Sequence, residues 1–227
     1  ITWLDYIANN NVATDYVSFH AYESWSEKVK NIRQELNTRQ LNNLPLILSG
    51  WTSFNMEDPN QTSYNCPIEK STSSMRFFRD VRSFVKLHDV VEVQWSQYRD
   101  AMWKIDDKWE SAFDKFGLLT IENKRKPLFN AMKLYGWMPI DRYEVSPDSI
   151  KSLFAMASAD PYNAGVVIWN TSTIPQMLSL NINNLPFAKG TFEVFRIDPN
   201  FGSIRECGDG CENRIDDGPI KFINSRS

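Results

Sequence analysis

The chain has 227 residues, enough for one large domain or two small ones with a buried core. Its 25 Lys and Arg and 28 Asp and Glu residues give a net charge of −3, and the two signs are mixed, without a basic block suited to nucleic acid. The 42% of hydrophobic residues form no run that could span a membrane, so neither nucleic acid nor a membrane is expected as a partner. The 8 Trp residues favour exposed rings that stack on sugars, although an aromatic-rich core would give the same composition.

Strand-like and helix-like segments alternate over the first part of the chain. The predicted strands are residues 15–22, 44–49 and 90–95, rich in β-branched, aromatic or aliphatic side chains. The predicted helices are residues 3–9, 27–37, 71–87 and a last one that Pro127 opens and Gly136, as the residue past its end, closes. Long loops, 51–70 and 96–116, follow the second and third strands. This order predicts a parallel α/β fold.

The pattern changes after residue 139. Short β-like segments at 150–157, 165–170, 177–182 and 190–196 are separated by turn signals such as Asp160-Pro161. They predict an antiparallel β-sandwich. We therefore expect two domains, residues 1–139 and 140–227.

Cysteines and glycosylation triplets bear on the compartment. Cys207 and Cys211 enclose a Gly-Asp-Gly loop flexible enough for a disulfide, whereas Cys66 has no obvious partner. Triplets beginning at Asn60 and Asn170 fit glycosylation. The first residues show neither an initiator Met nor a signal peptide, as in a processed or excised piece. We expect a secreted or otherwise extracytoplasmic protein, lysosomal included; a cytosolic protein with three reduced thiols is the alternative.

Polar and aromatic residues stand at the ends of the three predicted strands, where parallel α/β proteins place their chemistry. These are His20 and Tyr22 on the first strand, Trp51 on the second, and Gln94 and Trp95 on the third. Imidazole, phenol and amide groups suit sugar hydroxyls, and Trp faces suit the ring. Taken singly, such an aromatic is more often a core residue than a ligand contact, and His20 could equally be a hydrogen-bonded core histidine.

Two further candidates for sugar contact are Glu92 and Trp103. Glu92 shares its parity with Gln94 and could either bind a sugar hydroxyl or form a buried ion pair. Trp103 lies in the loop after the third strand. No histidine or cysteine set has the spacing of a metal site and no glycine-rich phosphate loop is present, so neither metal nor cofactor is expected.

The order and spacing of these strand ends resemble the last three β/α units of a clan A (β/α)8 retaining glycoside hydrolase, most closely glycoside hydrolase family 39. Asp15–Tyr22 resembles the sixth strand of that family, Leu44–Phe54 the seventh and Glu92–Gln97 the eighth, where Trp95 matches a stacking Trp often followed by a cis peptide bond. Gly117–Leu134 is similar to the run into the last barrel helix.

This resemblance implies that residues 1–139 are the C-terminal part of a (β/α)8 TIM barrel, about three β/α units, followed by an antiparallel β-sandwich over residues 140–227. It also implies hydrolysis of O-glycosyl bonds in an oligo- or polysaccharide by retaining double displacement, with Tyr22 orienting the nucleophile. The rival hypothesis from another class is a noncatalytic carbohydrate-binding protein, and a third is an unrelated α/β protein.

The sequence departs from the family at the nucleophile. The family has Glu where this chain has Gly50, which has no side chain to attack an anomeric carbon. We therefore expect this chain to be inactive, either because the glycine was engineered or because the protein is a natural pseudoenzyme; a wrong strand alignment is the remaining explanation.

A second departure concerns the general acid/base. The family takes it from an Asn-Glu pair at the end of the fourth strand, and the residues before Asp15 include only Asp5 as an acid. Because an incomplete barrel exposes strand edges, we expect a second polypeptide to supply the N-terminal barrel units and the acid/base Glu.

Overall fold

The computed structural model describes residues 2–22, 25–52, 70–85, 87, 90–95, 98–99, 103–105, 108–110, 117–143, 145, 152–177, 180–187, 189–203, 206 and 216–223, and of residues 22, 52, 103–105, 108–110 and 216–223 it describes the backbone alone. The chain divides into two compact units. The first comprises Ile1–Cys66 and Ser83–Gly117, the second Pro67–Arg82 and Leu118–Ser227. This division groups residues 67–82 and 118–139 with the C-terminal strands. The domain boundary expected after residue 139 stays a prediction.

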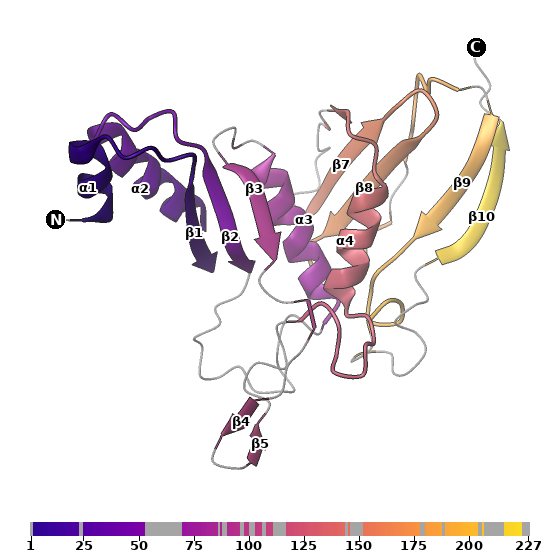
Figure 1. The fold of residues 1–227 in the computed structure, drawn as a ribbon. Coiled ribbons are helices and arrows are strands. Elements are labelled where there is room, and N and C mark those ends of the chain that lie inside the picture. The colour runs from indigo at the N-terminus through magenta and orange to yellow at the C-terminus, as the bar shows by residue number, and fades with distance from the viewer. Residues whose placement is uncertain are drawn as a thin grey trace. The chain divides into compact units, whose positions relative to one another are not determined.

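A three-stranded parallel sheet forms the centre of the first unit. Its strands are β1 (Val17–Tyr22), β2 (Leu46–Thr52) and β3 (Val90–Trp95), in the order β1-β2-β3 (Figure 1). The helices α1 (Trp3–Asn10) and α2 (Trp25–Thr38) precede β1 and β2. The parallel α/β order expected from the sequence is confirmed. An antiparallel pair, β4 (Trp103–Ile105) and β5 (Lys108–Glu110), lies in what was expected to be a loop.

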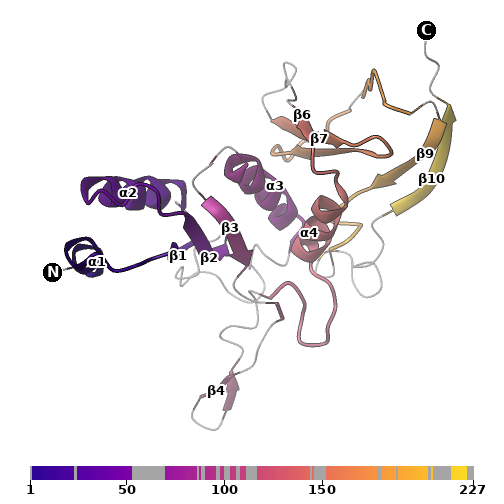
Figure 2. The same cartoon turned by 45° about the horizontal axis from the view of Figure 1, so that its top comes forward.

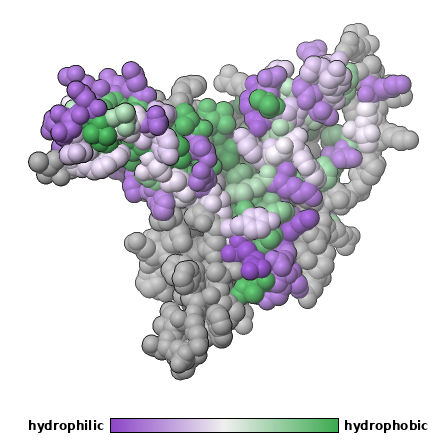
Figure 3. Space-filling view, in the orientation of Figure 1, coloured by the Kyte–Doolittle hydropathy of each residue, from purple (hydrophilic) through white to green (hydrophobic). Residues whose placement is uncertain are grey.

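Helix α2 buries an apolar stripe. Trp25, Val29 and Leu36 are all buried, and on the sheet so are Leu46 and Leu48. These positions on α2 follow helical spacing, which explains why the hydrophobic pattern was readable in the sequence. On the face seen in Figure 3, hydrophilic residues lie along the outer side of α1 and α2.

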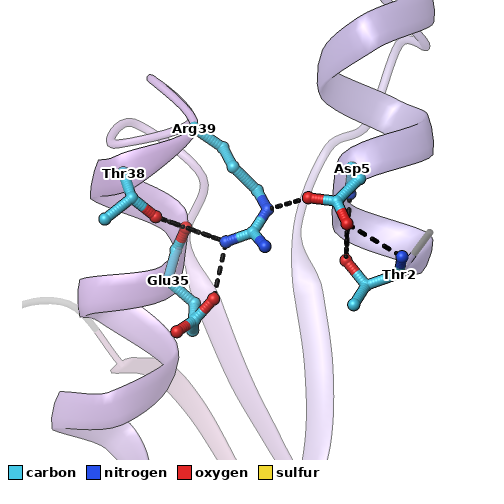
Figure 4. Close-up of polar contacts among 5 residues, drawn as sticks. All are labelled: Thr2, Asp5, Glu35, Thr38 and Arg39. Atoms are coloured by element: carbon cyan, nitrogen blue, oxygen red, sulfur yellow. Dashed lines mark hydrogen bonds and ion pairs between the residues drawn. The ribbon is translucent and has the colours of Figure 1, made fainter.

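An ionic network joins α1 to the end of α2 (Figure 4). Asp5 accepts hydrogen bonds from the Thr2 backbone N–H at 2.8 Å and the Thr2 hydroxyl at 2.7 Å. The Asp5 backbone N–H in turn donates to the Thr2 hydroxyl oxygen at 3.2 Å, which together with the Thr2 N–H bond forms a capping box at the start of α1. Arg39 donates from Nε to Asp5 at 2.7 Å and from Nη1 to Glu35 at 2.6 Å. The Thr2 hydroxyl and backbone N–H, with the Arg39 guanidinium, lower the pKa of Asp5 to about 2.

The second unit combines two helices and two antiparallel sheets. Its helices are α3 (Thr72–Phe84), of which the last two residues belong to the first unit, and α4 (Pro127–Trp137). One sheet has the order β6 (Arg142–Tyr143), β7 (Leu153–Ala159), β8 (Ala164–Asn170), and in the other β9 (Lys189–Phe195) pairs with β10 (Asp216–Ile223) (Figure 2). Two antiparallel sheets agree with the β-rich pattern of the sequence; their packing as a sandwich stays a prediction.

Aromatic and hydrogen-bond contacts fix α3 and α4 within this unit. Phe78 of α3 stacks on Trp169 with 6.1 Å between ring centroids, and Trp169 stacks on Phe154 at 5.8 Å. The hydroxyl of Ser74 donates to the Pro127 carbonyl at 2.9 Å, which ties α3 to the start of α4. These contacts hold the helices against the β6-β7-β8 sheet.

One expected helix end and one expected strand are wrong. Gly136 lies inside the last turn of α4, which continues to Trp137 and ends at Met138 in an extended conformation, so the helix has no glycine cap. The strand expected over residues 177–182 does not form at 177 or 180–182, the residues of it that the structure describes. Met177 there is 97% exposed, so it gains no burial that would favour a strand. Within the described residues, no helix is long and apolar enough to cross a membrane.

Candidate functional site

A β-bulge at Ser49 changes which face of the sheet the end of β2 presents. In the pairing of β1 with β2, Phe19 lies opposite Leu48 but His20 lies opposite Gly50, so Ser49 is the extra residue. The same shift appears on the other side, where Leu48 pairs with Val93 of β3 and the next pair is Trp51 with Trp95. Because side chains alternate along a strand, one inserted residue reverses the faces of all that follow.

Serine hydroxyls hold this bulge. The Ser18 hydroxyl donates to the Ser49 hydroxyl at 2.6 Å, and the Ser49 hydroxyl donates to the Phe19 carbonyl at 3.3 Å. The Ser49 side chain thus adds a hydrogen bond across the irregular part of the β1-β2 pairing. Sequence analysis missed both serines; the signal that could have found Ser49 is the break in parity between the buried Leu46 and Leu48 and the buried Trp51.

Beyond the bulge, Gly50 faces the imidazole of His20. A Cβ atom on Gly50 would lie 2.8 Å from both Cγ and Cδ2 of His20 and 3.1 Å from its Nε2. His20 itself is exposed, whereas Ala21, which follows it, is buried. The expected nucleophile position and the expected substrate-binding histidine therefore share one face of the sheet and contact each other.

Glu92 and Gln94 form a hydrogen-bonded pair on β3. Gln94 Nε2 donates to Glu92 Oε1 at 2.5 Å, and both residues are exposed. Glu92 lies in register with Ile47 of β2, which in turn pairs with Ser18 of β1. An exposed Glu92 does not fit the alternative of a buried ion pair. The exposed face of the sheet thus carries carboxylate, amide, imidazole and hydroxyl groups, a set that can donate to and accept from a polyol.

The two tryptophans at the strand ends lie on the opposite face from His20. Trp51 is 2% exposed and packs edge-on against Phe84 at 5.1 Å and Trp95 at 5.3 Å between ring centroids. Trp95 is half-buried. The bulge turns Trp51 away from the polar face, so its burial favours the core role that the sequence left open; its contact with sugar stays a prediction.

Several predicted site residues are described in part or not at all. Tyr22 ends β1, where its backbone lies opposite Thr52. The backbone of Trp103 opens β4. Asn60, Cys207, Cys211 and the Trp95-Ser96 peptide bond lie outside the described residues.

Asn170, the second expected glycosylation site, is the last residue of β8. Its Nδ2 donates to the Ile174 carbonyl at 2.9 Å, and its Oδ1 accepts from the Ser172 backbone at 2.9 Å. The amide is therefore engaged in the turn that follows the strand. No group of three or more His, Cys, Asp or Glu side chains suited to a metal occurs among the residues that the structure describes.

Comparison with known proteins gives matches among solved structures. No protein-family model matches the sequence, and the curated proteins give no significant match. A monomeric beta-xylosidase from Caulobacter crescentus CB15 matches with a TM-score of 0.69 at 12% identity, over 99% of this chain and 54% of the xylosidase. A GH39 beta-xylosidase from Caulobacter crescentus gives 0.64 at 15% identity, over 99% and 52%.

The GH39 enzyme from Xanthomonas axonopodis pv. citri gives a TM-score of 0.65 at 15% identity, over 97% of this chain and 52% of the enzyme. The chain therefore has an α/β fold similar to that of glycoside hydrolase family 39 enzymes, which confirms the expected resemblance at the level of the fold. It spans about half the length of these solved structures.

Proposed function

We propose that this chain is part of a retaining glycoside hydrolase that acts on O-glycosyl bonds of an oligo- or polysaccharide. In this proposal residues 1–139 are the C-terminal part of a (β/α)8 barrel and residues 140–227 a β-sandwich. The fold likeness to two beta-xylosidases and a GH39 enzyme supports it. The observation that carries it is the bulge at Ser49, because it turns position 50 onto the polar face of the sheet beside His20.

Retaining hydrolysis needs two carboxyl groups about 5–5.5 Å apart, one as nucleophile and one as general acid/base. Gly50 offers no carboxylate at the position where the family resemblance expects the nucleophile, so the chain with this sequence is inactive in our proposal. His20, Glu92 and Gln94 would hydrogen-bond sugar hydroxyls from the exposed face of the sheet. Tyr22 would orient a carboxylate at position 50.

The acid/base Glu and the remaining barrel units would come from a second polypeptide. Strands β1 and β3 are the edges of the described sheet, with one partner each. Trp3, Tyr6 and Tyr16, which precede β1, are 59%, 57% and 51% exposed. Exposed aromatic residues in the segment that leads into an edge strand favour contact with another protein surface.

We also propose an extracytoplasmic location for this chain, with a disulfide between Cys207 and Cys211 and glycosylation at Asn60 and Asn170. The support is the spacing of the two cysteines and the two acceptor triplets in the sequence. Mass spectrometry of the protein purified from its own cells, with and without reduction and glycosidase treatment, tests all three modifications.

A noncatalytic carbohydrate-binding protein is the second candidate. The close approach of His20 to Gly50 favours it, because an imidazole fills the space beside the backbone where a nucleophile would begin. In that case glycine is the native residue, and the polar face binds a glycan without cleaving it.

Gly50→Glu, with Gly50→Gln as its matched control, tests the proposal. Each variant is combined with the polypeptide that supplies the missing units and assayed on aryl β-xylosides and β-glucosides, both with His20 and with His20→Ala. We expect only Glu to release the aryl alcohol, with retention at the anomeric carbon by NMR. Glycan binding without hydrolysis by any Glu variant would establish the noncatalytic alternative.

A further inference from the structure

We infer that His20 is a positioning residue that decides whether position 50 can carry a side chain. The inference deepens the proposed function and rests on it for the role of position 50 in hydrolysis. Its steric part rests only on the geometry of β1 and β2. Any residue other than glycine at position 50 and the observed orientation of His20 exclude each other.

Distances set the size of the conflict. Carbon atoms in contact lie about 3.5–4.0 Å apart. A Cβ at position 50 would approach Cγ and Cδ2 of His20 to 2.8 Å, so it would overlap the ring by most of an ångström. Because Cγ is the ring atom nearest the backbone, small movements of the ring tip do not relieve the overlap. The whole imidazole must rotate about the Cα–Cβ bond into another rotamer.

The backbone itself does not require glycine at this position. Among the described glycines only Gly202 has a positive φ, so Gly50 has a backbone conformation that other residues adopt. The three heavy atoms nearest to an added Cβ all belong to one imidazole. The obstacle is thus a single side chain, and because His20 is exposed, solvent lies beside it into which the ring can rotate.

This geometry has a consequence for the nucleophile. A Glu placed at position 50 lies on the polar face only when the imidazole has left the observed position. The rotated imidazole then lies beside the new carboxylate, where it can donate a hydrogen bond to it. His20 therefore controls both the space for a side chain at position 50 and the hydrogen bonding of a nucleophilic carboxylate there, without being the nucleophile itself.

A double-mutant cycle on the full chain measures the steric coupling. Gly50→Ala adds one methyl group and no charge. With His20 present we expect it to lower Tm by at least about 2 °C, and in the His20→Ala background we expect this loss to disappear. Gly165→Ala in β8 is the matched control, because its added Cβ has no heavy atom nearer than 3.5 Å. It should give the same small shift in both backgrounds.

Position-specific NMR of the His20 ring provides a second readout if Gly50→Ala folds poorly. In the chain with Gly50 we expect contacts between the His20 ring protons and the α-protons of Gly50. In Gly50→Ala we expect the ring to have lost contact with the α-proton of residue 50. Equal Tm losses for Gly50→Ala in both backgrounds, or an unmoved ring, would overturn the inference.

Hydrolysis by Gly50→Glu in the completed barrel, measured both with His20 retained and in the His20→Ala background, separates the two proposals. Steric coupling without hydrolysis leaves the inference standing and removes the proposed function. Hydrolysis without steric coupling supports the proposed function and overturns the inference about His20.

Discussion

At the scale of single residues, the bulge at Ser49 determines which of two neighbours, Gly50 or Trp51, lies on the polar face of the sheet. Gly50 faces the exposed His20, whereas Trp51 is buried between Phe84 and Trp95. Both stand at a strand end, where a sugar site was expected. Consecutive residues of a strand point to opposite faces, and the inserted Ser49 decides that Gly50 lies on the face of His20 and Trp51 on the opposite one.

Trp51→Ala should therefore act on stability. Removing a buried Trp side chain costs about 3–5 kcal/mol through lost burial and the cavity left behind. Trp51→Phe retains most of the apolar contact with Phe84 and should cost less. Urea unfolding of the chain measures both losses. A Trp51→Ala variant with unchanged stability and lost sugar affinity would show that the ring serves binding instead.

Residue types at the candidate site were predictable, but their faces were not. The alternation that places Glu92 with Gln94 is local to one strand, and the structure shows both exposed and hydrogen-bonded to each other. The face of Gly50 depends on pairing with both neighbouring strands. A single strand's sequence does not contain that register, so only the three-dimensional pairing reveals the contact between Gly50 and His20.

At the scale of elements, helical spacing and strand composition located most of the first unit. Residues 90–95 form the strand expected. Helix α1 begins where expected and ends one residue later, and α2 begins two residues earlier and ends one residue later than expected. The end of α4 was predicted wrongly at Gly136 because glycine commonly ends helices, whereas here the last turn continues through it. A Cβ atom added to Gly136 would contact nothing within 4 Å. Strands β4 and β5 have three residues each, too few for an alternating hydrophobic pattern to predict them from the sequence.

The network around Asp5 predicts an acid-sensitive link between α1 and α2. The pKa of Asp5 is about 2 in the folded chain, against 3.8 ordinarily, because Thr2 and Arg39 hydrogen-bond its carboxylate. A lowered carboxyl pKa stabilises the folded state above about pH 4, and this stabilisation is lost as the pH falls from about 4 to about 2. The Tm difference between the chain and Asp5→Asn should therefore be constant above pH 4 and shrink towards pH 2.

Thr2→Ala provides the control for this link. It removes the hydroxyl that contributes most to the lowered pKa of Asp5, so its own pH dependence should shift towards that of an ordinary carboxyl. Thermal unfolding followed by circular dichroism from pH 2 to pH 7 compares the three proteins. Parallel curves for all of them would show that Asp5 does not couple the two helices to pH.

At the scale of the whole molecule, the alternation of strands and helices was sufficient to predict a parallel sheet, and the residues at the strand ends carried the resemblance to family 39 enzymes. The grouping of α3 and α4 with the antiparallel strands was not predictable. It depends on contacts such as Phe78 with Trp169, which join residues far apart in the sequence. No local pattern signals such contacts. The boundary predicted after residue 139 therefore rests on the change from alternating strands and helices to short β-like segments.

The open edges of the described sheet lead to the last prediction. β2 has neighbours on both sides, whereas β1 and β3 have one each. In the chain by itself, the backbone amides of β2 should exchange with solvent at least about tenfold more slowly than the outward amides of β1, meaning those that point away from β2. The outward amides have no hydrogen bond to another strand that must break before exchange. Addition of a polypeptide that carries the missing units should slow the outward amides of β1 and leave those of β2 nearly unchanged. Hydrogen exchange measured by NMR distinguishes these residues one by one, and a β1 edge equally protected with and without that polypeptide would contradict barrel completion at this edge.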